Sequence, residues 1–168
     1  MKTALAALAL TLSAGAASAG ELLVHTFSIH GKSTYEHTTH YSGVDGADGH
    51  VVVQWDVTET RRFNNTNLGL GWRFDNGAIV GTYENSYRHR SFYVGGVWMW
   101  PTSIPRLEVG LTALAITGYR EVTDKPVTVA GALGASYRVL DRTKAYVFFT
   151  PKVGRGEAVA HLAFGQEF

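Results

Sequence analysis

Residues 67–87 read NLGLGWRFDNGAIVGTYENSY, and this stretch decides the fold class. Large apolar side chains occupy every second position from Leu68 to Phe74, and the residues between them are mostly glycine. Such alternation is typical of an extended strand with one apolar face. The next three residues, DNG at 75–77, suit a tight hairpin turn, because Asn and Gly tolerate the positive φ angles of such turns. The stretch therefore predicts two antiparallel strands joined by a short turn.

The same alternation recurs along the chain between turn residues, and no helical periodicity is visible. It predicts eight strands, at 22–30, 67–74, 78–87, 92–100, 107–118, 127–139, 143–150 and 158–168. An even number of such strands is typical of a bacterial outer-membrane barrel. We therefore predict an all-β fold, an eight-stranded antiparallel transmembrane β-barrel, with its short connections on the periplasmic side and its long ones outside.

Both ends of the chain are consistent with export to the bacterial outer membrane. Residues 1–19 begin with Met-Lys, continue as an apolar run and end in Ala-Ser-Ala, a pattern that signal peptidase cleaves. The apolar run is too short for a membrane helix, which needs about 20 residues. The last strand carries apolar residues at alternate positions and ends in the aromatic Phe168. We expect a cleaved signal peptide (1–19) followed by the barrel (20–168).

The composition excludes several classes of function. The 15 Lys and Arg residues nearly balance the 14 Asp and Glu residues, whereas nucleic-acid recognition normally requires a strong basic patch. Cysteine is absent, so a disulfide framework is excluded. We expect a monomeric membrane protein that does not bind nucleic acid.

A segment at 31–66 interrupts the strand pattern between the first two predicted strands. It is rich in His, Thr, Gly and Asp, and its residues 50–57 again look like a strand. The predicted topology makes it a long outer loop, or a hairpin that rises above the membrane. Because the segment has neither a helical frame nor cysteine, we do not predict a metal site from its histidines. The histidines in or beside it are His30, His37, His40 and His50.

Two polar residues lie at matching heights on the predicted strands. His30 is eight residues beyond Leu22, and Ser86 is eight residues beyond Ala78. At a rise of about 3.3 Å per residue, both would lie roughly 26 Å from the strand starts. Each belongs to the more polar set of its strand, which in a membrane barrel faces the lumen. We predict that they meet at the outer mouth of the lumen, either as a base and an activated hydroxyl or as members of a polar network. The polar sets are Thr26, Ser28 and His30, and Thr82, Glu84 and Ser86.

Several motifs, taken in order, resemble one family. Ser-Ile-His at 28–30 is followed by Phe-Asn-Asn at 63–65 and by Gly-Thr-Tyr-Glu-Asn-Ser-Tyr at 81–87. Phe-Thr-Pro at 149–151 precedes a loop and the final strand. The pattern is similar to the lipid A palmitoyltransferase (PagP) family, small eight-stranded barrels that move an acyl chain from a phospholipid to lipid A. The resemblance covers most of the mature chain and implies these two lipids as substrates and no cofactor.

The resemblance also implies roles for particular residues. The family's histidine falls on His30, as base or proton relay, and its serine on Ser86, as nucleophile or hydrogen-bond donor to the transition state. The aspartate that precedes this serine in the family falls on Asn85, which carries no charge but can orient an imidazole ring. His25 is the alternative to His30 if the first strand is shifted, but the alternation puts it with Leu23 on the other face.

Two further features of the family concern the acyl chain. Proline removes a ladder hydrogen bond, and in the family a wall weakened in this way admits a lipid tail sideways. Pro151 is the candidate here unless it merely ends a strand, as we expect for Pro126. The glycine that sets the depth of the family's acyl pocket falls on or next to Val97, which follows Gly95 and Gly96. A bulkier side chain at this position implies a shorter acyl chain.

The sequence is thus consistent with three functions. The first is acyl transfer from a phospholipid to lipid A. The second is a non-enzymatic outer-membrane barrel that binds a partner through the segment at 31–66, which the uncharged Asn85 favours. The third is an esterase that removes a lipid A chain, with the same serine and histidine and with water as acceptor.

Overall fold

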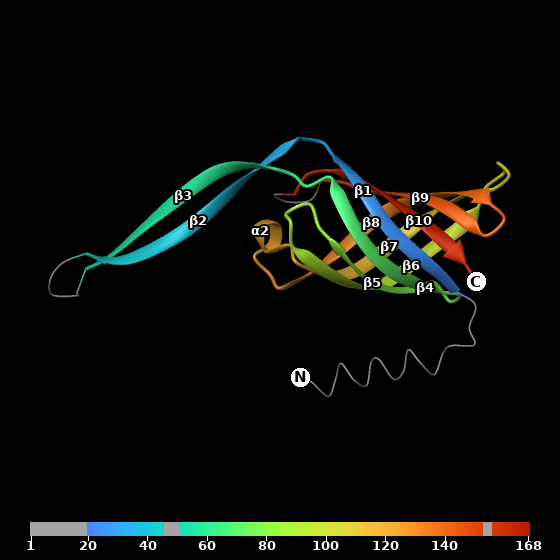
Figure 1. Ribbon diagram of the computed structural model, residues 1–168, viewed down its shortest axis with the longest axis horizontal. Coiled ribbons are helices and arrows are strands. Elements are labelled where there is room, and N and C mark those ends of the chain that lie inside the picture. Colours follow the sequence, from blue (N-terminus) through green and yellow to red (C-terminus); the bar gives the residue numbers. More distant parts are fainter. Residues whose placement is uncertain (1–19, 46–50, 153–155) are drawn as a thin grey trace, which may run out of the picture.

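The computed structural model describes residues 20–45, 51–152 and 156–168. The expected signal peptide at 1–19 lies outside these residues, as do residues 46–50 of the long predicted loop. In the described part, eight strands form one closed barrel and two more form a separate sheet (Figure 1). The predicted all-β, eight-stranded antiparallel barrel is confirmed.

The barrel strands follow one another around the wall, and every neighbouring pair is antiparallel. They are β1 (Gly20–His30), β4 (Thr66–Phe74), β5 (Ala78–Glu84), β6 (Arg90–Pro101), β7 (Leu107–Thr117), β8 (Val127–Leu140), β9 (Thr143–Thr150) and β10 (Val159–Glu167). Strand β1 closes the barrel, because it pairs with both β4 and β10. The predicted strand ends hold to within three residues; the largest difference is at β5, which ends at Glu84.

The turn predicted after Phe74 is present. The N–H of Gly77 donates to the carbonyl of Phe74 (2.9 Å), and Gly77 has a φ of 85°, which glycine adopts without steric cost. Short connections like this one also follow β6 and β8, and we call their end of the barrel the turn end. The opposite end, which carries the connections after β1, β5, β7 and β9, is the loop end.

Strands β2 (Thr34–Asp45) and β3 (Val51–Arg62) form a two-stranded sheet of their own. This β2–β3 arm projects away from the loop end of the barrel (Figure 1). Each strand has 12 residues, so the arm is roughly 40 Å long at about 3.4 Å per residue. The segment expected to be a long loop or a hairpin is therefore a hairpin.

One short helix, α2 (Arg120–Thr123), lies at the loop end between β7 and β8. Within the described ranges, no helix has the length and hydropathy that a membrane-spanning helix requires.

The outer surface of the barrel wall is apolar. Its large exposed side chains include Ile29, Leu68, Leu70, Phe92, Val94, Leu111, Val129 and Leu133. Aromatic side chains gather near the turn end, where the rings of Trp72 and Phe168 stack with their centroids 5.8 Å apart. Leu68 and Leu70, on the apolar face predicted for β4, belong to this outer surface.

Charged side chains fill the lumen near the turn end. The hydroxyl of Tyr146 donates to the buried carboxylate of Glu21 (2.7 Å), and Arg73 pairs with the same carboxylate (3.2 Å). Lys144 pairs with Glu108 (3.0 Å) and with Glu167 (3.2 Å). Buried charges require partners of opposite sign, and each charged side chain of this network has one. The network therefore fills this end of the lumen with its charges already paired. None of these residues lines the cavity that lies nearer to the loop end.

Candidate functional site

His30 and Ser86 come together at the loop end of the barrel. Nε2 of His30 lies 2.7 Å from Oγ of Ser86, and Nδ1 of His30 lies 3.1 Å from Oδ1 of Asn65. An amide oxygen only accepts hydrogen bonds, so Nδ1 carries the proton and Nε2 accepts from the Ser86 hydroxyl. In this arrangement a histidine can remove the proton of a hydroxyl as the oxygen attacks a carbonyl. The structure brings together the histidine and serine paired from the sequence; their catalytic roles stay predictions.

The Phe-Asn-Asn motif at 63–65 holds this pair in place. The ring of Phe63 stacks on the ring of His30, with a centroid distance of 4.3 Å and an interplanar angle of 5°. The N–H of Asn64 donates to the carbonyl of Ser86 (2.8 Å). Asn65 supplies the acceptor for Nδ1. These three consecutive residues therefore fix both the imidazole and the backbone that carries the hydroxyl.

Asn85 has a different role from the predicted one. Its side chain is fully buried, its Oδ1 accepts two hydrogen bonds and its Nδ2 donates two. The partners are the N–H groups of Tyr87 and His89, the hydroxyl of Ser91 and the carbonyl of Gly118. Asn85 therefore stabilises the turn that follows β5 and does not contact His30. The expectation that it orients the imidazole is wrong, and Asn65 occupies that position.

A β-bulge in β1 overturns the predicted alternation of that strand. Against β10, His25 pairs with Ala163 and Phe27 pairs with Leu162, so Thr26 is an extra residue of β1 relative to β10. Against β4 the register shifts in the opposite sense, because Phe27 pairs with Thr66. The inserted residue reverses the alternation, and the side chains that face inward are Leu23 and His25 before the bulge and Ser28 and His30 after it. His25, expected on the opposite face from His30, is thus buried inside the barrel.

A second correction concerns β5. Ile79 and Tyr83 line the interior, whereas the predicted inward pair, Thr82 and Glu84, does not. Ser86 reaches the interior nevertheless, because β5 ends at Glu84 and Ser86 lies in the following turn, outside the strand alternation. The wall of the lumen is therefore aromatic and apolar at β5, where polar residues were expected.

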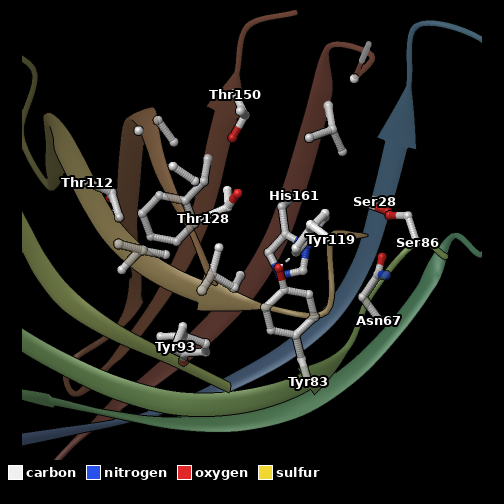
Figure 2. Close-up of a pocket in the computed structure, with 18 of the residues that line it drawn as sticks. Ser28, Asn67, Tyr83, Ser86, Tyr93, Thr112, Tyr119, Thr128, Thr150 and His161 are labelled. Carbon is white, nitrogen blue, oxygen red and sulfur yellow. Dashed lines mark hydrogen bonds between the residues drawn. The ribbon is translucent and has the colours of Figure 1, made fainter. Parts of the chain in front are cut away.

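A cavity of about 280 Å³ begins at the His30–Ser86 pair and extends into the barrel. Figure 2 shows Ser28, Ser86 and Asn67 on one side of it and Thr112 and Thr128 on the other. The wall formed by β7, β8 and β9 is mainly apolar. Its apolar lining residues include Leu114, Ile116, Ala130, Ala132 and Phe148.

The residues expected at the acyl pocket are distributed between the two faces of the wall. Val97 is buried and lines the cavity, and it is the lining residue of β6 nearest the turn end. Gly96 belongs to the outer face, because a Cβ at this position would lie 2.5 Å from the ring of Trp98. The expectation that Gly96 lines the pocket is therefore wrong. Pro151 directly follows the last residue of β9, and it also lines the cavity. It therefore both ends a strand and borders the cavity.

The barrel wall is incomplete beside Pro151. Strand β8 pairs with β7 from Val127 to Tyr137, but it pairs with β9 only from Leu133 onward. Among the described residues, Val127–Ala132 therefore have no strand partner on the β9 side. Several of them, including Thr128 and Ala130, line the cavity. The cavity thus borders a part of the wall that backbone hydrogen bonds do not close.

A second polar cluster crosses the lumen, and the sequence prediction missed it. Nδ1 of His25 lies 2.9 Å from Nε2 of His161, and Nε2 of His25 lies 2.6 Å from the hydroxyl of Tyr93. The hydroxyl groups of Tyr83 and Tyr119 are 2.7 Å apart. Burial raises the pKa of Tyr119 well above its usual value, and Tyr83 raises it further, so Tyr119 stays uncharged.

Little in the sequence distinguishes these residues. His161 is one polar residue in an alternating strand. His25 was not chosen as a site residue, because the predicted alternation put it on the face opposite to His30. No group of three or more His, Cys, Asp or Glu residues comes together as a metal site in the described part of the chain.

Comparison with known proteins identifies no family for this chain. No protein-family model matches the sequence, and no curated protein matches it. The function is therefore inferred from the geometry of the His30–Ser86 pair and its cavity.

Proposed function

We propose that this protein is an outer-membrane acyltransferase that moves an acyl chain from a phospholipid to lipid A. The observation that carries the proposal is the 2.7 Å contact between His30 and Ser86 at the mouth of a cavity with an apolar wall. An ester whose alkyl chain lay in this cavity would present its carbonyl carbon to Oγ of Ser86.

His30 is the base in the proposed reaction. Nε2 of His30 removes the proton of the Ser86 hydroxyl as Oγ attacks the ester carbonyl of the phospholipid. The bond from the carbonyl carbon to the glycerol oxygen breaks, and the proton passes from His30 to that oxygen, which releases a lysophospholipid. A lipid A hydroxyl then attacks the acyl-serine, and its proton returns through His30 to Oγ. One ester is broken and one is formed, so the reaction needs no cofactor.

The surface of the wall supports a location in the outer membrane. A closed barrel pairs most of the backbone N–H and C=O groups of its strands with one another, as spanning a bilayer with strands requires, and the stretch Val127–Ala132 is the exception described above. The exposed side chains of its outer face, such as Leu70, Val94 and Leu111, are apolar, as in membrane barrels. In this location the loop end and the β2–β3 arm would face the outside.

The open part of the wall supports a route for the acyl chain. Lipid tails that surround the barrel would meet the unpaired stretch Val127–Ala132, beside Pro151 and the cavity. A chain that entered there would not have to cross the ring of Phe63 or the polar residues at the mouth. The route would bring the ester of a membrane phospholipid to Ser86 from the side.

Mass spectrometry of lipid A from bacteria that express the protein tests this proposal. We expect lipid A to gain one acyl chain, and we expect no gain with Ser86→Ala or His30→Ala. Ser42→Ala, the same change at an exposed serine of the arm, is the matched control and should behave like the wild type. An unchanged lipid A in membranes that contain the folded barrel would overturn the transferase, and the loss of a chain would identify the esterase.

The β2–β3 arm supports a second candidate function. The exposed rings of Tyr41 and Trp55 stack on one face of the arm, with centroids 5.6 Å apart. Exposed apolar surface of this kind often marks an interaction site. In this alternative the protein is a non-enzymatic barrel that binds a partner at the cell surface. Unchanged lipid A, together with cell-surface binding that Trp55→Ala abolishes and Ser86→Ala preserves, would favour it.

A further inference from the structure

Ser28 and His161 form a second polar site in the cavity, below the His30–Ser86 pair. The two residues lie directly opposite each other on β1 and β10, and both line the cavity. Directly opposite residues of an antiparallel pair have Cβ atoms about 5 Å apart. The side chain of Ser28 is almost completely buried, yet its hydroxyl has no hydrogen-bond partner. A buried hydroxyl without a partner is costly, so its position in a cavity marks a site for a polar ligand atom.

His161 offers a second hydrogen-bonding atom at the same height. Its Nε2 is bonded to Nδ1 of His25, whose Nε2 is bonded to Tyr93, so the ring is held from one side. Because two ring nitrogens in a hydrogen bond share one proton, at least one of the two rings is neutral. Nδ1 of His161 has no partner among the residues that the structure describes, and this nitrogen therefore remains available to a ligand.

The lining of the cavity restricts the ligand group to an uncharged one. The described lining residues include no Lys or Arg, and their one acidic residue, Glu157, is paired with Lys32 and Lys152 at the loop end. A serine hydroxyl donates and accepts, and a ring nitrogen does one or the other according to its tautomer. A ligand hydroxyl satisfies both at once, because it too donates and accepts.

The height of the site relates this hydroxyl to the ester. Ser28 and His161 lie two residues nearer the turn end than His30 and its partner Val159. With a rise of about 3.3 Å per residue and a tilt of about 40°, this is roughly 5 Å deeper in the barrel. A carbonyl at Ser86 would therefore place carbons close to the ester beside Ser28 and His161.

We propose that the cavity accepts a hydroxyacyl chain, whose hydroxyl lies on a carbon close to the ester and is bound by Ser28 and His161. The apolar wall of β7, β8 and β9 takes the rest of the chain. The proposal rests on the proposed function, because it takes Ser86 as the position of the ester carbonyl. It names the substrate class of that site as β-hydroxyacyl esters.

Binding of two unreactive amides tests this inference without any catalysis. The probes are the N-methyl amides of decanoic acid and of β-hydroxydecanoic acid, titrated calorimetrically into the full chain in detergent micelles, with protein-free micelles as background. We expect the hydroxylated amide to bind about five-fold more tightly, the effect of one or two neutral hydrogen bonds. Ser28→Ala and His161→Phe should abolish this preference. Ser42→Ala removes a hydroxyl from the arm, outside the cavity, and should preserve it.

The outcomes separate this inference from the proposed function. Equal affinities for the two amides in the wild type would overturn the hydroxyacyl site, whatever lipid A shows. A preference that persists in both variants would also overturn it. If His161→Phe does not fold, Ser28→Ala alone decides, because it removes only a hydroxyl. A clear preference together with unchanged lipid A would overturn the transferase and support the binding site.

Discussion

Nε2 of His30 lies 2.7 Å from Oγ of Ser86, although 56 residues separate them in the chain. Much of that separation is the β2–β3 arm, and the residues at its base hold the pair. Phe63 stacks on the imidazole, the N–H of Asn64 binds the carbonyl of Ser86, and Asn65 accepts from Nδ1. The excursion of the chain into the arm therefore ends in the segment that orients the site.

Asn65 should control the rate of acyl transfer through the orientation of His30. We expect Asn65→Ala to lower the rate about tenfold, which corresponds to about 1.4 kcal/mol of transition-state stabilisation. Asn65→Asp should retain or raise the rate, because a carboxylate accepts from Nδ1 and also stabilises the imidazolium. Initial rates with a phospholipid donor in micelles measure both effects. Full activity of Asn65→Ala would exclude the orienting role.

Asn85→Asp should destabilise the protein without activating it. Its Nδ2 donates to Ser91 and to the carbonyl of Gly118, and a carboxylate oxygen there would meet that carbonyl as a second acceptor. We expect the free energy of unfolding to fall by about 3 kcal/mol, as for buried polar groups left unpaired. Urea titration in micelles measures this loss. Faster transfer with unchanged stability would instead support the role that the family resemblance implies for this position.

Val97→Gly should lengthen the acyl chain that is transferred. Val97 is buried and is the lining residue of β6 nearest the turn end, so removal of its side chain deepens the cavity. Val94→Gly makes the same change on the same strand at an outward-facing side chain and serves as control. With a mixture of donors, the mass of the added chain should increase for Val97→Gly only. Identical chain-length profiles for the two variants would show that Val97 does not limit the cavity.

Leu111→Arg tests whether the apolar outer face lies in lipid. Leu111 is an exposed residue in the middle of β7. Arginine on the lipid face of a barrel near the bilayer midplane costs about 2–4 kcal/mol, so unfolding from vesicles should require that much less free energy. Gln54→Arg, at an exposed position of the arm, should change stability little. Equal effects of the two substitutions would argue against insertion at β7.

The barrel should fold without most of the β2–β3 arm. No barrel strand pairs with β2 or β3, and Tyr35 and Arg61 are paired directly across the arm. We therefore expect that replacing residues 36–60 by an Asn-Gly turn leaves circular dichroism and thermal unfolding of the barrel unchanged. Tyr35 is kept because its ring packs against the ring of Phe63, with the two centroids 5.0 Å apart. Failure of this variant to form the barrel would show that the arm takes part in folding.

Local patterns in the sequence were sufficient to predict the barrel strands. Alternation and turn residues are properties of adjacent positions, and both the strand ends and the turn at Gly77 follow from them. The orientation of side chains was predicted less well. Thr26 is an extra residue of β1 relative to β10, and this bulge is visible only in the pairing of the two strands. Nothing local to His25 indicates that it faces the lumen.

The sequence was sufficient to predict the eight-stranded barrel, the position of the long segment between its first two strands and the approximate height of His30 and Ser86. These features depend on the periodicity of short segments. The three-dimensional structure was needed to show that Asn65 rather than Asn85 binds the imidazole, that Gly96 faces outward, and that His25 and His161 meet inside the lumen. The contacts of His30 with Asn65 and of His25 with His161 join residues far apart in the chain, so they depend on register and bulges set by the pairing of the whole sheet.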